Sequence, residues 1–380
     1  MPAAMTSRQR LLAAIRHQPV DRVPIFIRGV PVCREDWVKG RHPSYKPVID
    51  AVREKTDVTH IVGVDTGMFL GKRDVVEVTN RTEPSKREGF LEDVSVIHTP
   101  KGDLTSRHYR STRGLPGMEA EHYVKTPADL EKFFSIPYKP FHPDTSHVQK
   151  EIDRVGESAL VHVNGGTEPI SLAYTLLGSE LLAMWSVEER KLVRDILDEG
   201  QRRVQEHVRF LLANCSAEVI AFSGHELGLP PLLRARDFEE FVTEYERPTY
   251  AIVHEAGRLI HVHSHGKLGK FLESFVTMGI DVTHPVEGPP MGDITVAEAR
   301  RRVGTKLCIE GNIQIGDVYT LPTDQIRALV RRTIDEARSA GGPGGFILCP
   351  TASPFTPELD PLVVANYLAL IDTAREYGAN

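Results

Sequence analysis

The sequence contains no long hydrophobic run and no excess of positive charge. No apolar stretch reaches the ~18 residues of a membrane span, and the N-terminus lacks the core and cleavage site of a secretory signal. We therefore expect no membrane association. The 52 acidic residues outnumber the 46 lysines and arginines, which gives a net charge of −6. This balance argues against a nucleic-acid partner, because a phosphate-binding surface needs a basic face.

Cysteine is also scarce. The four cysteines, Cys33, Cys215, Cys308 and Cys349, show no CxxC spacing. This spacing argues against a disulfide framework and a zinc knuckle. We expect a protein of the reducing cytoplasm.

The sequence does contain a regular series of short β-rich segments separated by helical patterns. Strands are predicted at residues 23–28, 58–64, 159–163, 218–222, 259–263, 280–284, 306–310 and 345–349. Most are near-continuous apolar runs, as is typical of parallel strands covered on both faces. Eight such units predict an α/β fold, a (β/α)8 TIM barrel that forms one domain over residues 1–380. An open doubly wound sheet is the alternative, but no GxGxxG motif follows the first strand.

An insert of about residues 70–140 follows the second predicted strand. Within it, residues 74–80, 91–99 and 103–109 read as antiparallel strands, with a turn at 100–103, so we expect a β-hairpin-bearing lobe beside the barrel mouth. Helix start signals are also present. Thr6 with Gln9 forms a capping box, and Thr126 precedes a first-turn proline and Asp129.

Four potential metal ligands lie at or just past predicted strand ends: His263, His265, Glu287 and Cys349. The side chains at positions i and i+2 of a strand share one face, so His263 and His265 are expected to point together into the barrel mouth. Imidazole, carboxylate and thiolate form a zinc-type ligand set. The alternatives are hydrogen-bonded rim histidines, a carboxylate that caps a helix and a small buried thiol.

Further polar residues follow other strands, where barrel enzymes carry their chemistry. Asp65 is a candidate acid, base or substrate anchor, and Glu226 is a candidate acid/base or support for a metal ligand; a helix cap is the alternative for Asp65. Arg28, Asn164 and Asn312 are candidate substrate-binding residues. For Asn312 a turn-forming role is an alternative.

Several motifs give a resemblance to a known family. The opening Thr6-Ser-Arg-Gln-Arg-Leu-Leu-Ala-Ala-Ile-Arg-His, followed by Asp21-Arg-Val-Pro, resembles the N-terminus of the uroporphyrinogen decarboxylase superfamily. Further similar motifs are Leu177-Gly178-Ser-Glu, His263-Ser-His-Gly, Gly279-Ile-Asp-Val, Glu310-Gly-Asn312-Ile and Ala365-Asn366-Tyr. The resemblance covers essentially the whole chain and implies a (β/α)8 barrel.

The superfamily contains true decarboxylases and zinc-dependent methyltransferases that work with corrinoid proteins. True decarboxylases carry an arginine-rich loop after the first strand, where this chain has only Arg28. The methyltransferases show a His-x-Cys motif and a later cysteine. His263 matches the histidine, His265 replaces the first cysteine, and Cys349 lies close to the last; Glu287 matches the glutamate of the wider zinc methyltransferase group.

The resemblance therefore implies a zinc-dependent methyltransferase. Its partner would be a corrinoid protein that carries cobalamin, and its substrate a small methyl donor or a thiol acceptor. Two imidazoles leave zinc more positive than thiolates would, which favours methyl-ether cleavage. Dimerisation is common in this family, so a homodimer is an expected assembly. A uroporphyrinogen decarboxylase-like enzyme and a non-catalytic tetrapyrrole binder are the alternatives.

Overall fold

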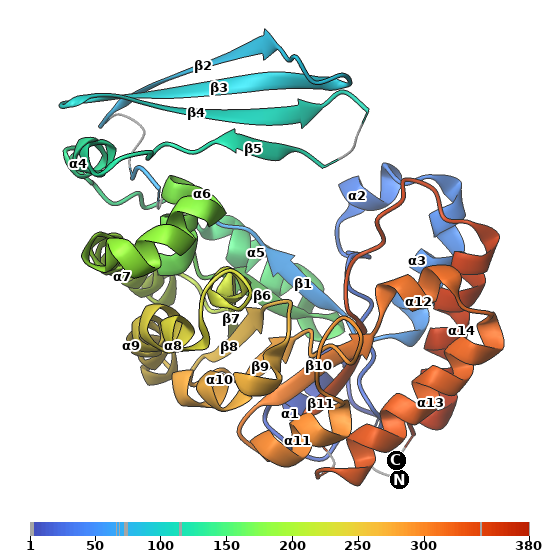
Figure 1. Cartoon of the computed structure of the whole chain (residues 1–380). Helices are drawn as coiled ribbons and strands as arrows, with labels where there is room; N and C mark the ends of the chain where they lie inside the picture. The colour runs from blue at the N-terminus through green and yellow to red at the C-terminus, as the bar shows by residue number, and fades with distance from the viewer. Residues whose placement is uncertain are drawn as a thin grey trace.

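The computed structural model describes residues 4–65, 67, 69–71, 75–113, 116–342 and 344–379. Its centre is a curled sheet of seven parallel strands, in the spatial order β1-β6-β7-β8-β9-β10-β11 (Figure 1). The strands are β1 (Thr59–Val62), β6 (Leu160–Asn164), β7 (Val219–Ser223), β8 (Leu259–His263), β9 (Val282–His284), β10 (Cys308–Ile313) and β11 (Phe346–Pro350). Seven of the eight predicted strands are confirmed.

The first predicted strand, at 23–28, is not a regular strand. It makes a single parallel bridge, Ile25 to Leu348 of β11, with hydrogen bonds from Phe26 N to Leu348 O (2.9 Å) and from Leu348 N to Pro24 O (2.9 Å). On its other side, Asp57 N donates to Ile25 O at 2.7 Å, just before β1. The segment thus joins both edges of the sheet at the end where the strands begin. Pro24 and, on β11, Pro350 both lack the N–H group that would extend this ladder on either side of the bridge.

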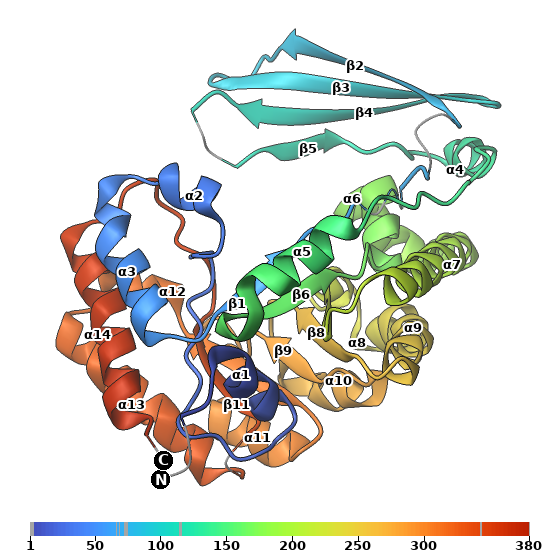
Figure 2. The ribbon, with the colours of Figure 1, turned by 180° about the vertical axis from the view of Figure 1, so that it is seen from behind.

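Along each strand, successive side chains point alternately into the barrel and out toward the helices. The inward-facing residues of the first layer are apolar and pack against α1 (Ser7–Ile15) in one cluster that includes Leu11, Leu160, Val219, Val282 and Ile347. Helix α1 begins with the predicted capping box, in which Gln9 N donates to Thr6 Oγ1 at 3.1 Å. Figure 2 shows α1 beside β11 at this end of the sheet. Helix α1 therefore covers the end of the barrel where the strands begin.

The other helices form the outer shell. They include α2 (Glu35–Lys39), α3 (Lys46–Lys55), α5 (Ser146–Val155), α6 (Pro169–Glu188), α7 (Arg190–Asn214), α8 (Ala235–Phe238), α9 (Glu244–Glu255), α10 (Leu272–Met278), α11 (Val296–Val303), α12 (Ile315–Thr320), α13 (Thr323–Ser339) and α14 (Pro361–Tyr377). By length and composition alone, α6 could cross a membrane, contrary to the sequence expectation. However, half of that window is buried within the fold, and a buried core helix meets the same test.

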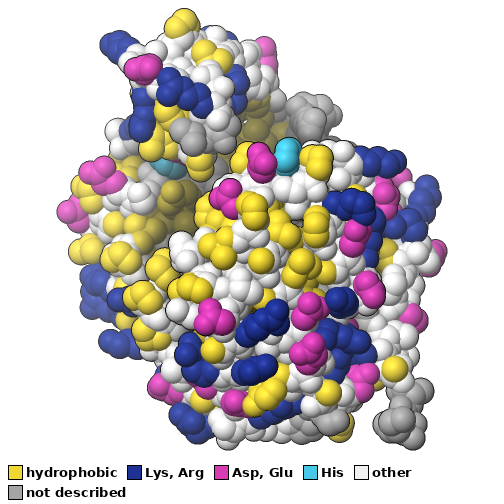
Figure 3. Space-filling view, turned by 90° about the vertical axis from the view of Figure 1, so that its right-hand side faces the viewer, with side chains coloured by type: hydrophobic (Ala, Val, Ile, Leu, Met, Phe, Trp, Pro, Cys, Tyr) yellow, Lys and Arg dark blue, Asp and Glu magenta, His cyan; other side chains and the backbone are white. Residues whose placement is uncertain are grey.

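A separate antiparallel sheet lies between β1 and β6 in the chain. Its strands are β2 (Glu77–Pro84), β3 (Phe90–Thr99), β4 (Gly102–Ser111) and β5 (Met118–Glu121), in that spatial order. Figure 1 shows this sheet above α6, with α4 (Pro127–Phe134) at one end. Ile97 and Leu104 belong to the same core cluster as Leu130 and Phe133 of α4. A space-filling view shows a hollow between this sheet and the rest of the molecule (Figure 3).

Candidate metal centre

The second layer of inward-facing residues is polar. Counting two residues on from the apolar layer along β6, β8, β9, β10 and β11 gives five side chains of one face: His162, His261, His284, Glu310 and Cys349. All five are at most 5% exposed. Buried histidines, a carboxylate and a thiol in a single layer are an unusual filling for a barrel, since purely structural layers carry branched apolar residues.

Three of these side chains form a potential cation site. One ligand atom each from His284, Glu310 and Cys349 lies within 4.8 Å of the others. His284 also stacks on His263, with 5.1 Å between ring centroids and 3.0 Å between the two Nδ1 atoms. The His284 Nε2 group lies 3.0 Å from Pro350 O, which fixes the proton on Nε2 and leaves Nδ1 as an acceptor or ligand.

The charges in this layer are set by burial and by Arg28. Burial and the positive charge of Arg28 lower the pKa of His263 to about 2, and they also hold the pKa of His284 well below its usual value. Both imidazoles are therefore neutral at pH 7. Burial opposes ionisation of Glu310, but the hydrogen bond from His261 and the nearby Arg28 outweigh it and lower its pKa. The carboxylate is charged.

Cys349 behaves differently. Burial and the adjacent Glu310 carboxylate raise the pKa of its thiol well above the usual value, although Arg28 acts in the opposite direction. The thiol is thus protonated in the absence of a cation. A divalent ion would displace that proton, since the thiolate is the ligand form of cysteine.

The predicted ligands fall into two neighbouring groups. Cys349 lies in the deeper layer with His284 and Glu310. Nearer the mouth, His265 Nδ1 lies 3.2 Å from Glu287 Oε2, and Gln314 Nε2 donates to Glu287 Oε1 at 3.2 Å. Burial disfavours the charged Glu287, but the His265 hydrogen bond prevails and lowers its pKa. His263 connects the groups, since its ring lies 4.9 Å from that of His265 and contacts His284.

The sequence reasoning missed His284 and Glu310 as potential ligands. Both stand at the ends of predicted strands, in His284-Pro-Val-Glu287 and Glu310-Gly-Asn312, so the sequence did contain a signal for them. The parity of β9 and β10 would have placed both side chains inside the barrel. His261 lies in the same layer, where its Nε2 is 3.5 Å from Glu310 Oε2 and only 6% of its side chain is exposed.

The other candidates occupy varied positions. Asp65 is exposed just past β1, where its Oδ1 accepts a hydrogen bond from Gly67 N at 3.1 Å, and its charge acts on His207. Asn164 Oδ1 accepts from Gly166 N at 3.0 Å. Asn312 is half-buried and pairs in register with Cys349. Arg28 is half-buried and influences the charges of the whole polar layer.

Glu226 lies past β7 beside a second buried polar group. Its Oε2 atom is buried and, in the described part of the chain, has no hydrogen-bond partner. Burial of Glu168 raises the pKa of that side chain, and the nearby charge of Glu226 raises it further. Glu168 Oε1 in turn lies 2.8 Å from His225 Nδ1. Glu226 is therefore connected to buried titratable groups between the barrel and α9.

Solved structures show the same fold at low sequence identity. A methyltransferase from Methanosarcina mazei aligns over 98% of this chain and 99% of its own, with a TM-score of 0.60 and 16% identity. A B12-independent methionine synthase from Shewanella sp. W3-18-1 aligns over 93% and 97%, with a TM-score of 0.50 and 13% identity. These likenesses support the fold alone.

Sequence comparison identifies the family. No curated protein sequence matches the chain at a significant level. The profile of the uroporphyrinogen decarboxylase (URO-D) family, however, matches residues 109–377, which is well over half of the chain. The resemblance seen in the sequence motifs is thereby confirmed, and the protein is a member of the uroporphyrinogen decarboxylase family.

Proposed function

We propose that this protein is a zinc-dependent methyltransferase that exchanges a methyl group between a small molecule and a corrinoid protein. The observation that carries the proposal is the inward-facing group of His284, Glu310 and Cys349, with His263 against His284. Two solved proteins of the same fold are named as a methyltransferase and as a methionine synthase. The URO-D family match is compatible with this activity.

The residues fit a divalent ion. Glu310 Oε1 is buried and has no hydrogen-bond partner among the described residues. An orphaned buried carboxylate oxygen is unfavourable unless a cation or a proton satisfies it. Tetrahedral zinc with Zn–N bonds of about 2.0–2.1 Å places two ligand nitrogens roughly 3.3 Å apart. The 3.0 Å between the Nδ1 atoms of His263 and His284 is close to that spacing.

We assign the zinc ligands to Cys349, Glu310 and His284, with His263 as the fourth group. This assignment modifies the set His263, His265, Glu287 and Cys349, and keeps His263 and Cys349. Bound zinc would stabilise a thiolate or withdraw charge from a departing oxygen. With only one thiolate ligand, zinc keeps more of its positive charge, which favours cleavage of a methyl ether.

The remaining polar residues would position the substrate. The half-buried Arg28 guanidinium lies near the polar layer and has no hydrogen-bond partner among the described residues. A carboxylate or sulfonate on the substrate would neutralise it. Glu226 is the candidate group for moving a proton to or from the substrate. Asn312 and Asn164 are candidates for hydrogen bonds to uncharged substrate oxygens.

Zinc content, measured by elemental analysis after loading and dialysis, tests the ligand assignment. We expect Glu310→Gln and Cys349→Ser to lose most of the bound zinc, because each removes an anionic ligand. His265→Ala should retain zinc, since that side chain is 42% exposed and pairs with Glu287. Circular dichroism establishes that each variant folds. Retention in Glu310→Gln together with loss in His265→Ala would instead favour the ligand set nearer the mouth.

Methyl transfer itself is measured with a cobalamin probe. Purified zinc-loaded protein should change the absorption spectrum of cob(I)alamin when a methoxylated substrate is added, and His284→Ala should abolish the change. A metal-free decarboxylase is the second candidate because the matched family carries that name. Turnover of uroporphyrinogen by zinc-free protein would support it over methyl transfer.

A further inference from the structure

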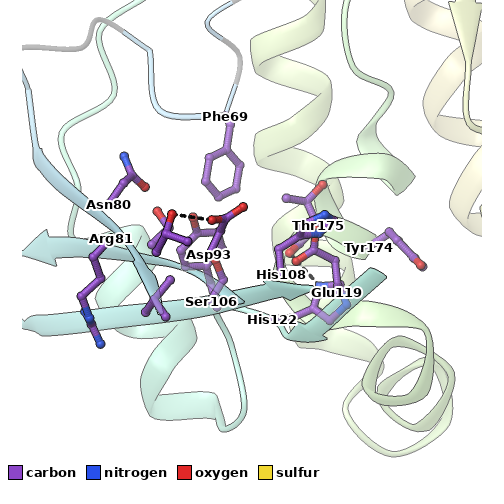
Figure 4. Close-up of a pocket in the computed structure, with 14 residues that line it drawn as sticks. Phe69, Asn80, Arg81, Asp93, Ser106, His108, Glu119, His122, Tyr174 and Thr175 are labelled. Carbon is purple, nitrogen blue, oxygen red and sulfur yellow. Dashed lines mark hydrogen bonds and ion pairs between the residues drawn. The ribbon is translucent and has the colours of Figure 1, made fainter. Parts of the chain in front are cut away.

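A cavity that is open on one side lies outside the barrel, between the antiparallel sheet and α6. Its volume is about 680 Å³, which is within the range of small-molecule sites. Residues from β2–β5, the loop residue Phe69, and Tyr174 and Thr175 of α6 line it. Figure 4 shows Phe69 descending from its loop toward Asp93 on β3, with Asn80 and Arg81 to the left and His108 and Thr175 to the right.

The face of the sheet that lines this cavity changes from apolar to polar along the strands. Near α4, the cross-strand pair Ile97 and Leu104 is apolar and at most 1% exposed. Two residues further along the same face, the pair is Ser95 and Ser106, and Asn80 extends that row across β2. The apolar pair packs against α4, and the polar rows begin where the sheet face borders the cavity.

The row formed by Asn80, Ser95 and Ser106 is available for binding. None of these three side chains has a hydrogen-bond partner in the protein among the described residues, and all three line the cavity. An amide and two hydroxyl groups can each donate and accept hydrogen bonds. Their complement is therefore a ligand whose own groups both donate and accept, as hydroxyl groups do.

The charged groups of the lining are already paired. Asp93 accepts hydrogen bonds from Arg110 Nε at 2.6 Å and from Thr82 Oγ1 at 2.7 Å, and these bonds lower its pKa to about 2. His108 Nδ1 lies 2.8 Å from Glu119 Oε1. Arg81 turns its guanidinium away from the other labelled residues (Figure 4) and donates to Glu83. Among the described lining residues there is therefore no cationic clamp for an anion and no unpaired carboxylate for a cation.

The apolar part of the lining is aromatic. The rings of Phe69 and Tyr123 lie 5.5 Å apart at 34° and both border the cavity. Flat aromatic faces bury the C–H face of a ring-shaped ligand. From the uncharged donor-and-acceptor row and these rings, we propose that the cavity binds a neutral sugar. This site is separate from the candidate metal centre and does not depend on the proposed methyl transfer.

Saturation-transfer NMR on the full chain tests the proposal with three neutral probes: cellobiose, maltose and sucrose. At least one should receive saturation and bind the double variant Ser95→Ala/Ser106→Ala about tenfold more weakly, as the loss of two neutral hydrogen bonds implies. Thr105→Ala is the matched control, because Thr105 pairs with Val96 on the opposite face of the sheet. Its affinity should equal that of the wild type.

Two further experiments test the effect of a charge on the ligand and the contribution of the Phe69 ring. Glucuronate should bind more weakly than glucose, because the lining residues that the structure describes include no free cation. Phe69→Leu should weaken sugar binding while preserving apolar packing. The unfolding temperature of each variant separates a loss of binding from a loss of structure. Absence of transfer from all three probes, tighter binding of glucuronate, or unchanged affinity in the folded double serine variant would each overturn the proposal.

Discussion

Asp57 joins the N-terminal helix to the start of the barrel. The carboxylate is fully buried and accepts from Arg10 Nη1 at 2.5 Å, from two Arg22 nitrogens at 2.7 and 2.9 Å, and from Ile25 N at 2.9 Å. It thereby satisfies two guanidinium groups that are themselves at most 7% exposed. Removal of one partner from such a buried ion pair strongly destabilises the fold, because the other charge stays buried without a partner.

We therefore predict that Asp57→Asn lowers the free energy of unfolding by about 3–5 kcal/mol. Urea unfolding monitored by circular dichroism measures the change. Asp36→Asn removes an exposed carboxylate that pairs with Arg34, so its unfolding midpoint should stay at the wild-type value. Equal effects of the two substitutions would contradict the importance of the buried position.

Asp21 gives the same region a pH dependence. The hydrogen bond from Arg10 is the main cause that lowers the pKa of Asp21 to about 2. A carboxyl with a depressed folded-state pKa contributes stability above its unfolded-state pKa, which is about 3.9, and loses it as the pH falls toward the folded-state value. The contribution is therefore fully present at pH 7 and declines between about pH 4 and 2.

We predict that Asp21→Asn is less stable than the wild type at pH 7 and that the difference shrinks as the pH falls from about 4 toward 2. Thermal unfolding over a pH series measures both proteins. A difference that stays constant over this range would show that the charge of Asp21 makes no contribution.

The alternation of side chains between the two faces of a strand explains which parts of the site the sequence could predict. The His-x-His motif was expected to keep both rings on one strand face, but β8 ends at His263. His265 therefore leaves the strand geometry and meets Glu287, while His263 keeps the face of His261 and contacts His284. That last contact depends on how β8 and β9 are aligned, which no local pattern specifies.

At the scale of elements, local start signals were read correctly. Thr126 caps α4 as expected, since its hydroxyl accepts from Asp129 N at 3.4 Å and Asp129 Oδ2 accepts from Thr126 N at 3.1 Å. The 23–28 segment was read as a strand from its apolar residues, although Pro24 limits it to one bridge. Apolar content predicts burial well, but it does not predict how many backbone hydrogen bonds a neighbouring strand will accept.

The α4 cap also supports the sheet, because Leu130 and Phe133 share a core cluster with Ile97 and Leu104. We predict that Thr126→Ala destabilises α4 by about 1 kcal/mol. Hydrogen exchange should show faster exchange in α4 and in the adjacent ends of β3 and β4, with little change in the barrel strands. Faster exchange throughout the molecule would indicate that α4 and the barrel unfold as one unit.

At the scale of the whole molecule, metal binding and stability are linked. A ligand that binds only the folded state stabilises it by about 2.7 kcal/mol at a hundredfold excess over its dissociation constant. We predict that zinc raises the Tm of the wild type in a concentration-dependent manner and that EDTA reverses the rise. Cys349→Ser should show no zinc-dependent shift, whereas Cys215→Ser should retain it, because Cys215 lies outside the barrel and contacts Leu211 O.

Helix α1 closes the end of the barrel where the strands begin. Reactants of the proposed site at His284, Glu310 and Cys349 would therefore enter and leave at the other end, where the strands finish. In the proposed methyl transfer, the small substrate and the protein partner would both have to reach the site from that end. Because no residue is assigned to hold the methyl group between them, the small substrate would have to enter first and stay bound while the protein partner docks over it.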